Sequence, residues 1–345
     1  MIWDRIATLP LVIDGYALER LDAAGYDRTT TQFRLSGAGE EGVGEDVGLF
    51  DEGGEALHAA GPYLELRGDW TLASFCAHLA TVDQWQVAPP EWEMARSWRN
   101  WAFESAALDL ALRQAGVSLP EALGLEPRPV RFVNSLGLGD PPSAALIADR
   151  FTQHPTVGFK LDAAASWDEA IVADLAALGC VATVDFKGRY GLEVEDEAAL
   201  IAMYRVVLSA FGAALFEDPH ELPEVEALLD PVRDRLSLDA PIHRAADIST
   251  PTINVKPSRI GGLQPLFEIY EHCAAHDVVM YGGGMGELGV GRGQIELLAA
   301  LFHPDSPNDV APSAFNEPEI PDGLPASPLV FADLEPGFRP TPRGG

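Results

Sequence analysis

The chain has 345 residues, of which 47% are hydrophobic and 22% are charged, a composition typical of a globular protein with a sizeable core. Lysine and arginine total 23 against 53 aspartates and glutamates, so the formal net charge is -30. Such an acidic surface repels phosphate backbones and anionic lipid headgroups. We therefore expect neither nucleic acid nor a membrane surface as a partner.

The cysteines and the N-terminus exclude two further classes of protein. Cys76, Cys180 and Cys273 are far apart in apolar stretches, which indicates buried small side chains rather than a disulfide framework or a zinc site. The first 20 residues lack a basic segment followed by an apolar run, and nowhere do eighteen apolar residues follow one another. These features predict a cytoplasmic protein.

Residues 1–98 predict a small α+β unit. Strand-like stretches occur at 29–37 and 61–68, a helix is expected near 71–82, and the turn-rich run 37–46 suggests a hairpin. A helical pattern follows over 101–116 and ends at a glycine, which marks a junction between domains.

From residue 130 onward, short apolar strands alternate with amphipathic helices, the signature of βα units in a parallel sheet. The expected strands are 131–136, 156–162, 181–187, 213–219, 236–241, 252–257, 278–283 and, weakly, 309–315. One helix is expected to begin with a capping box of Ser166 and Glu169 and to end at Gly179, and another to cover 195–211. Eight strands without a G-x-G-x-x-G fingerprint favour a closed barrel over a doubly wound sheet. We expect the last residues to be poorly ordered.

Lysine is the scarcest basic residue of the chain. It occurs at Lys160, Lys187 and Lys256 only, so 20 of the 23 basic residues are arginines. Either residue serves a surface ion pair, whereas a general base or a Schiff-base former requires an amine whose pKa can approach neutrality. All three lysines follow or end predicted strands, at the barrel edge that carries active sites, so they are candidate catalytic residues.

Three carboxylates lie at the ends of successive predicted strands: Asp185, Glu217 and Asp239. Carboxylates that converge at a barrel mouth repel one another unless a cation is present, and a set of oxygen ligands suits Mg²⁺. Each carboxylate alone is equally well explained as a helix cap. Lysines beside a divalent ion fit a reaction in which an amine moves an α-proton while the ion stabilises an enolate.

Several motifs together resemble the enolase superfamily, and within it the muconate-lactonizing, mandelate-racemase and o-succinylbenzoate-synthase-like members. These motifs are GVGE, AFESAALDLAL, FKLD, VDFKG, FEDP, LSLDAP, INVKPSRIGGL and GGGMGELGVGRG. The resemblance implies an α/β fold, with an N-terminal α+β capping domain over 1–98, a modified TIM barrel of the (β/α)7β type over 99–325 and a C-terminal tail over 326–345.

The resemblance also implies an activity and roles for residues. One Mg²⁺ would be held by Asp185, Glu217 and Asp239, and a proton would be abstracted α to a carboxylate of a small substrate. Lys256 would act as an acid, base or cation on one face of the substrate, and Glu287 would be a catalytic residue at the end of strand seven. The stretch 15–31, with Tyr16 and Tyr26, would close over the barrel mouth and help to select the substrate.

This chain departs from the family pattern at strands two, three and five. Members usually carry Lys-x-Lys on strand two, and the second lysine is the base, but Asp162 stands at that position after Lys160. The third position of the usual Asp-x-Asn on strand three is Lys187, and Ala240 replaces an acid after Asp239. We hypothesise that Lys187 has taken over as the base, or is paired with Asp162 in a way that keeps it charged.

Other residues have structural and functional explanations side by side. The glycines at 282–286 form a phosphate cradle or a close turn beside the substrate. His243 titrates in catalysis or bonds a backbone carbonyl. Arg259 and Arg292 bind a substrate carboxylate or make structural salt bridges. Trp98 and Trp101 are expected to pack between the domains.

Three functions remain open from the sequence. The first is a Mg²⁺-dependent isomerase, racemase or lyase that acts through a metal-stabilised enolate, and the second is a Schiff-base aldolase on Lys256. The third is a catalytically silent, ligand-binding barrel, favoured by the missing lysine at Asp162. Barrels of this kind often self-associate, so a homo-oligomer is possible.

Overall fold

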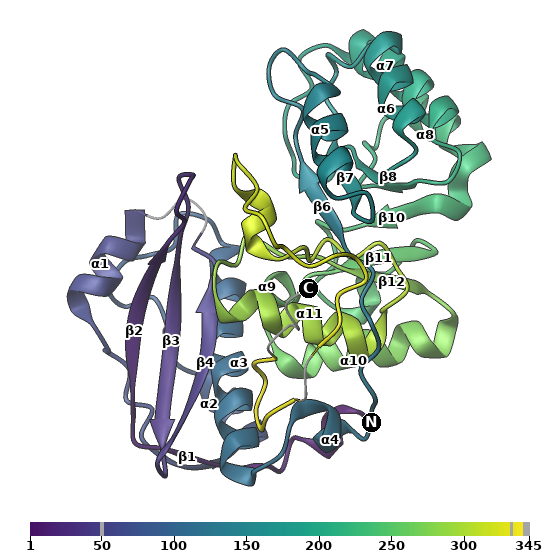
Figure 1. Cartoon of the computed structure of the whole chain (residues 1–345). Helices are drawn as coiled ribbons and strands as arrows, with labels where there is room; N and C mark the ends of the chain where they lie inside the picture. Colours follow the sequence, from purple (N-terminus) through teal and green to yellow (C-terminus); the bar gives the residue numbers. More distant parts are fainter. Residues whose placement is uncertain (49–51, 332–333, 341–345) are drawn as a thin grey trace.

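The computed structural model describes residues 1–48, 52–331 and 334–340 (Figure 1). It contains an N-terminal domain built on antiparallel strands and a larger domain built on a curled parallel sheet, which confirms the predicted fold. Within these described ranges, none of the helices has the length and apolar character needed to cross a membrane.

The N-terminal domain combines two small antiparallel sheets with short helices. Its strands are β1 (Pro10–Ile13), β2 (Gly15–Asp22), β3 (Thr29–Gly37), β4 (Glu40–Asp46) and β5 (Gly68–Thr71), and its helices are η1 (Trp3–Arg5), α1 (Glu52–Ala60) and α2 (Leu72–Leu79). Strands β2, β3 and β4 form one sheet, and β1 pairs with β5. The expected strand over 61–68 is wrong, because regular pairing begins only at Gly68.

The long helix α3 (Ala95–Ala115) lies against strand β4 and begins six residues before the predicted helix. Two glycines of the GVGE motif allow this contact. A Cβ atom at Gly42 would lie 2.2 Å from the carbonyl oxygen of Ala106, and one at Gly44 would lie 2.0 Å from that of Ala102. Side chains at these positions would push the sheet away from the helix. Helix α3 ends at Gly116, which has the left-handed conformation typical of a C-cap.

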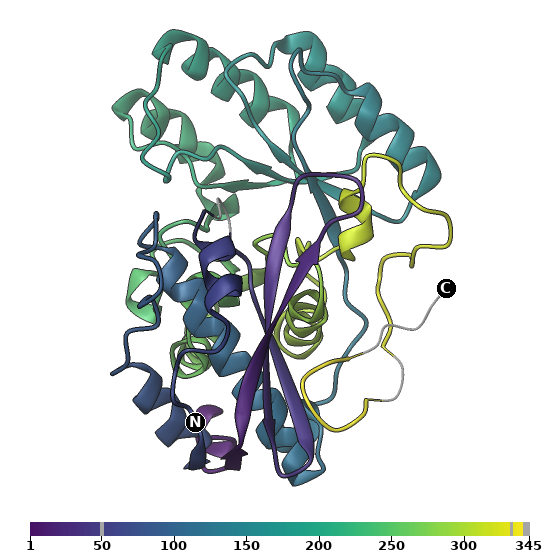
Figure 2. The same ribbon diagram turned by 90° about the vertical axis from the view of Figure 1, so that its left-hand side faces the viewer.

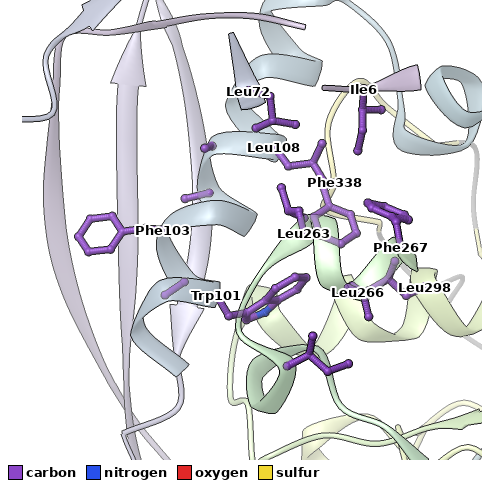
Figure 3. Close-up of a cluster of buried hydrophobic side chains, with 14 of the residues drawn as sticks. Ile6, Leu72, Trp101, Phe103, Leu108, Leu263, Leu266, Phe267, Leu298 and Phe338 are labelled. Carbon is purple, nitrogen blue, oxygen red and sulfur yellow. The ribbon is translucent and has the colours of Figure 1, made fainter. Parts of the chain in front are cut away.

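Helix α3 also forms the core between the two domains (Figure 3). Phe103 points toward the three-stranded sheet, where its ring centroid lies 4.5 Å from that of Phe33. On the other side of the helix, Trp101 and Leu108 pack with Leu263 of the barrel domain. The predicted interdomain packing of Trp101 is therefore confirmed.

The barrel sheet consists of seven parallel strands in sequential order. They are β6 (Val133–Leu136), β7 (Gly158–Asp162), β8 (Val181–Asp185), β9 (Leu215–Glu217), β10 (Leu236–Leu238), β11 (Thr252–Val255) and β12 (Val279–Gly282). The α-helices of this part of the chain are α4 (Leu119–Leu123), α5 (Ala145–Gln153), α6 (Glu169–Leu178), α7 (Glu197–Ala210), α8 (Pro223–Leu229), α9 (Pro257–Ile260), α10 (Leu263–His276) and α11 (Val290–Phe302). Short 3-10 helices are η2 (Asp230–Arg235), η3 (Ala245–Asp247) and η4 (Ser313–Asn316).

The eighth predicted strand is not a strand. Two single bridges replace it, between Asn308 and Phe132 at one edge of the sheet and between Asp309 and Gly283 at the other. Backbone bonds join Val133 N to Asn308 O at 2.8 Å and Asp309 N to Gly282 O at 2.7 Å. Asn308 and Asp309 thus connect the two edges of the sheet. The predicted strand does not continue, because Pro312 interrupts it and the chain then enters η4.

The start of α6 also differs from the prediction. Asp168, not Ser166, is the N-cap, and its carboxylate accepts bonds from the backbone N–H groups of Ala170 and Ile171 at 3.0 Å. Aspartate and serine are comparable N-caps, so the choice between neighbouring candidates depends on the entering backbone. The predicted C-cap at Gly179 is confirmed.

The C-terminal segment is more ordered than expected. It runs back over the N-terminal half of the molecule (Figure 2), where the side chain of Phe338 is fully buried beside Leu108 and Leu263 (Figure 3). The Phe338 N–H donates to Asp109 at 2.7 Å, and Arg339 forms an ion pair with the same carboxylate at 2.6 Å. The predicted disorder is therefore wrong through residue 340, and 341–345 lie outside the described residues.

Candidate active site

The carboxyl ends of the barrel strands surround a cavity of about 310 Å³. All three lysines of the chain line it: Lys160 on β7, Lys187 two residues after β8 and Lys256 directly after β11. The full lining is Asn134, Ser135, Lys160, Lys187, Lys256, Gly284, Gly286, Arg292, Asp309, Ala311 and Asn316. The structure thus brings together the lysines that the sequence singled out.

Three carboxylates converge beside this cavity. Asp185 ends β8, Glu217 ends β9 and Asp239 follows β10, and each side chain is completely buried. One oxygen from each lies within 4.8 Å of the other two. Parallel strands end at the same edge of a sheet, so carboxylates that end successive strands come together in three dimensions.

Cationic side chains surround the acidic triad of Asp185, Glu217 and Asp239. Lys160 Nζ forms an ion pair with Glu217 and lies 3.2 Å from Asp185 Oδ2. Lys256 Nζ lies 2.9 Å from Asp239 Oδ2. These pairs offset the repulsion among buried carboxylates, which would otherwise be costly.

Asp239 has two further partners. Arg259 pairs with its Oδ1, and the hydroxyl of Tyr190 donates to its Oδ2 at 3.0 Å. The Arg259 guanidinium also donates to the Tyr190 oxygen at 3.0 Å. Of the two uses considered for Arg259, the structure shows the salt bridge.

Asp218 fixes the backbone that carries Asp239. Its carboxylate accepts hydrogen bonds from the N–H groups of Asp239 and Ala240, both at 2.8 Å. Asp218 has a φ of 47°, a strained conformation for a non-glycine residue, which turns its side chain toward β10. Burial and the nearby Asp239 raise the pKa of Asp218 to about 6.

Glu217 is held from the barrel interior. Its Oε2 accepts a hydrogen bond from the hydroxyl of Tyr281 and another from Asn254 Nδ2 at 3.3 Å. The Tyr281 hydroxyl is also 2.9 Å from Ser237 Oγ. Sequence reasoning missed Tyr281 because a tyrosine inside a strand pattern is equally well explained as a core residue.

The pKa values of the triad move in different directions. Burial raises the pKa of Glu217, and the positive charge of Lys160 only partly offsets this effect. Burial also acts to raise the pKa values of Asp185 and Asp239, but nearby cations outweigh it and both pKa values are lowered. At Asp185 these cations are Lys160 and Lys187. At Asp239 they are Arg259 and Lys256. The cationic side chains therefore stabilise the negative charges of Asp185 and Asp239, whereas burial disfavours the charge of Glu217.

Lys187 lies between two carboxylates. Its Nζ is 2.6 Å from Asp185 Oδ2 and 3.1 Å from Asp162 Oδ1, and its backbone φ is 54°. Asp162 and Asp185 are register partners on β7 and β8, so their side chains are adjacent. Burial and Lys160 lower the pKa of Lys187, but Asp185 and Asp162 outweigh them, and the pKa rises. Lys187 thus forms an ion pair with Asp162, the arrangement that one form of the hypothesis proposed.

Glu287 lies beneath the glycine-rich turn after β12 rather than on the cavity wall. It accepts bonds from Met285 N at 3.0 Å and Ser258 Oγ at 3.4 Å, and Arg292 is 3.5 Å away. A Cβ atom at Gly283 would lie 2.7 Å from Lys256 Cε. The glycines therefore let the turn approach Lys256 closely, which favours the close-turn interpretation over a phosphate cradle.

The N-terminal domain contacts the same turn. Arg28, near the tip of the β2–β3 hairpin, donates to the carbonyl oxygens of Gly286 at 3.0 Å and Met285 at 2.9 Å. The buried Glu45 accepts bonds at 2.6 to 3.1 Å from the N–H groups of Leu288 and Gly289, which directly precede α11, and of Gly291 in its first turn. The hairpin tip lies beside η4 (Figure 2), and the Tyr26 hydroxyl interacts with Asn316 of the cavity wall.

The remaining candidates have structural contacts. His243 Nδ1 is 3.3 Å from the carbonyl oxygen of Arg259, and the side chain of Trp98 is buried near Val47. Cys180 and Cys273 are buried, and Cys76 is partly buried. Besides Tyr281, sequence reasoning missed Tyr190 and Asp309, because isolated loop residues carry no periodic signal.

The acidic triad fits a divalent cation. The three donors are all carboxylate oxygens, they are buried, and they converge from three strands. Three oxygen ligands leave room for water and a substrate carboxylate, which suits Mg²⁺. The residues present are therefore compatible with the metal that the resemblance implies.

Comparisons with known proteins agree with this geometry. An N-succinylamino acid racemase from Amycolatopsis sp is 30% identical over 258 residues, which are 70% of this chain and 66% of that protein. An o-succinylbenzoate synthase from Geobacillus stearothermophilus is 27% identical over 227 residues, 62% of this chain and 58% of that protein. The chain thus matches about three fifths to two thirds of the length of these relatives.

Solved structures share the fold over nearly the whole chain. A dipeptide epimerase from Methylococcus capsulatus, solved with a Mg ion, has a TM-score of 0.67 at 19% identity and covers 94% of this chain and 98% of its own. The sequence relatives, together with the shared fold, identify this protein as a member of the enolase superfamily, which confirms the resemblance. More narrowly, the chain belongs to the family described as domain of unknown function DUF8230, whose N-terminal and C-terminal domain models match residues 4–122 and 126–317.

Proposed function

We propose that this protein is a Mg²⁺-dependent enzyme that removes a proton α to the carboxylate of a small organic acid. One observation carries the proposal: the only three lysines of the chain line one cavity, beside three converging buried carboxylates. The racemase, synthase and epimerase names of the relatives support a reaction of this class. The outcome would be racemisation, isomerisation or elimination.

The side chains divide into three roles under this proposal. Asp185, Glu217 and Asp239 would hold the cation, which when bound supplies a Lewis acid for negative charge on the substrate. Lys187 after β8 and Lys256 after β11 would hold or move the proton at their Nζ atoms. The two amines enter the cavity from strands that are separated by two others, β9 and β10, so a substrate between them can be approached from two sides.

Lys160 has a different environment from the other two lysines. Its side chain is almost completely buried, and its ammonium group contacts two carboxylates of the acidic triad, Glu217 and Asp185, whereas Lys187 and Lys256 each contact one. A lysine that stays protonated supplies fixed positive charge at the cavity wall. We assign Lys160 to charge stabilisation rather than to proton abstraction.

The aldolase alternative lacks a supporting contact. A Schiff-base former reacts as an uncharged amine, whereas Lys256 Nζ is paired with Asp239 at 2.9 Å. A silent barrel would have no need to keep its three lysines together in one cavity. The structure therefore favours enolate chemistry over both alternatives.

Calorimetric titration of Mg²⁺ into chelator-stripped protein tests the metal part of the proposal. We expect one saturable site that is lost in Glu217→Gln, while weak binding to the acidic surface persists in both proteins. Small carboxylic acids are then screened by NMR for loss of the α-proton signal in deuterated water. Absence of a distinct site in the wild-type protein would contradict metal-assisted chemistry.

A further inference from the structure

The two carboxylate oxygens of Glu217 have different kinds of partner. Oε2 accepts bonds from two neutral donors, the Tyr281 hydroxyl and Asn254 Nδ2. Oε1 instead faces the ammonium group of Lys160. Both Glu217 and Tyr281 are completely buried, so water does not compete for these bonds.

The hydrogen bonds at Tyr281 have a fixed direction. A Glu217 that binds a cation is a carboxylate, which only accepts hydrogen bonds, so Tyr281 donates its single hydroxyl proton to Glu217 Oε2. Ser237, 2.9 Å from the Tyr281 oxygen, must then donate to Tyr281. The chain from Ser237 through Tyr281 to Glu217 therefore holds one oxygen of the carboxylate in place.

A cation entering the triad affects the two oxygens differently. With a cation bound, the Lys160 ammonium group would be repelled and Oε1 would be free, whereas the neutral Tyr281 hydroxyl at Oε2 would not be repelled. Asp185 shows the same division, because its Oδ1 accepts a bond from the backbone N–H of Lys187 at 2.9 Å and its Oδ2 faces lysine side chains. Each of these two carboxylates thus offers one oxygen to a metal ion.

We propose that Tyr281 confines Glu217 to one available oxygen and thereby makes the site selective for Mg²⁺ over Ca²⁺. Mg²⁺ requires six ligands in octahedral geometry and keeps several waters, whereas Ca²⁺ takes six to eight oxygens and gains from a bidentate carboxylate. A one-oxygen Glu217 satisfies the smaller ion and withholds a ligand from the larger one. This inference rests on the proposed metal site.

The test compares the dissociation constants of Mg²⁺ and Ca²⁺ in four proteins by calorimetry. They are the wild type, Tyr281→Phe, Ser237→Ala and the control Tyr270→Phe, which removes a buried hydroxyl on α10, where the ring stacks on Phe302. Loss of an outer-shell partner typically weakens metal binding by about 10- to 100-fold. We expect Tyr281→Phe to weaken Mg²⁺ binding by about 10-fold or more and Ca²⁺ binding less, so that the preference for Mg²⁺ falls.

Ser237→Ala keeps the tyrosine ring and should shift the preference in the same direction by a smaller amount, while Tyr270→Phe should leave it unchanged. An equal loss of affinity for Mg²⁺ and Ca²⁺ in Tyr281→Phe would indicate a merely structural role and would overturn the inference. Dissociation constants equal to those of the wild type in that variant would also overturn it. Failure of the proposed function is a separate result, because the wild type itself would then lack a saturable Mg²⁺ site.

Discussion

Lys187 belongs to the charge network of the site and is also the proposed base. Its ammonium group contacts both Asp185 and Asp162. We predict that Lys187→Met lowers turnover on a substrate found by the exchange screen by about 100- to 10,000-fold, the usual contribution of a general acid or base. Mg²⁺ affinity should be retained or increase, since a positive charge beside Asp185 is removed. Steady-state kinetics and calorimetry measure the two effects.

The control for this variant is Lys187→Arg. Arginine keeps the positive charge but does not give up its proton at neutral pH. If proton transfer is the role of Lys187, Lys187→Arg should be as inactive as Lys187→Met. Recovery of activity in the arginine variant would assign Lys187 to charge stabilisation, and unchanged turnover in the methionine variant would end the idea of a relocated base.

Glu296 makes stability depend on pH. Burial raises its pKa to about 8, and Arg292 only partly offsets this. In the unfolded chain a glutamate loses its proton near pH 4.3. Between these values the folded protein holds a proton that the unfolded chain has lost, so the free energy of unfolding falls as pH rises. We predict that Glu296→Gln, which cannot ionise, becomes progressively more stable than the wild type from pH 5 to pH 8.

Chemical denaturation at several pH values checks this prediction. Below pH 4 both folded and unfolded Glu296 are protonated, so the advantage of Glu296→Gln should have disappeared there. An advantage that stays constant from pH 5 to pH 8 would contradict a raised pKa at this position.

At the scale of elements, helix α11 begins on a carboxylate supplied by another domain. Glu45→Ala would leave the N–H groups of Leu288, Gly289 and Gly291 without their acceptor. Losing a helix cap costs about 0.5–2 kcal/mol, and leaving the one fully buried group, the Gly291 N–H, unpaired adds about 1–3 kcal/mol. We predict that Glu45→Ala lowers the free energy of unfolding by about 2–4 kcal/mol.

Glu40→Ala is the matched control, because Glu40 is an exposed residue of the same strand. A surface substitution of this kind changes stability by less than about 0.5 kcal/mol. Equal effects of the two substitutions in urea denaturation would show that Glu45 does not support α11.

The elements also show where sequence reasoning succeeds. Apolar strand runs followed by charged residues locate β7, β8 and β9 and place Asp185 and Glu217 at the edge where they meet. Local pattern is enough here because parallel strands share one direction. It is not enough for 309–315, where closure of the sheet depends on two residues that bridge distant edges. Nor does it separate Tyr281 from an ordinary core residue, because its partner Glu217 is 64 positions away in the chain.

At the scale of the whole molecule, a net charge of -30 makes the folded chain repel itself. Raising KCl from about 0.1 M to about 1 M shortens the screening length from about 10 Å to about 3 Å. We predict that the thermal midpoint rises by several degrees over this range at pH 7. Differential scanning calorimetry measures the shift.

Repeating the calorimetry at both KCl concentrations at a pH nearer the isoelectric point tests whether the stabilisation comes from charge screening. At pH 5 some carboxylates are protonated and the net charge is smaller, so the gain from KCl should shrink. An equal gain at both pH values would assign the stabilisation to an effect other than screening.

The placement of the lysines has a practical consequence for covalent labelling. Apart from the α-amino group of Met1, every primary amine of this chain lies on the wall of one cavity. At an alkaline pH that uncharges part of the lysine population, an acylating reagent that attacks amines is therefore directed to the candidate active site by the composition of the protein itself. Molecules that occupy the cavity would slow that acylation, so ligands can be ranked by the protection they give before the reaction is known.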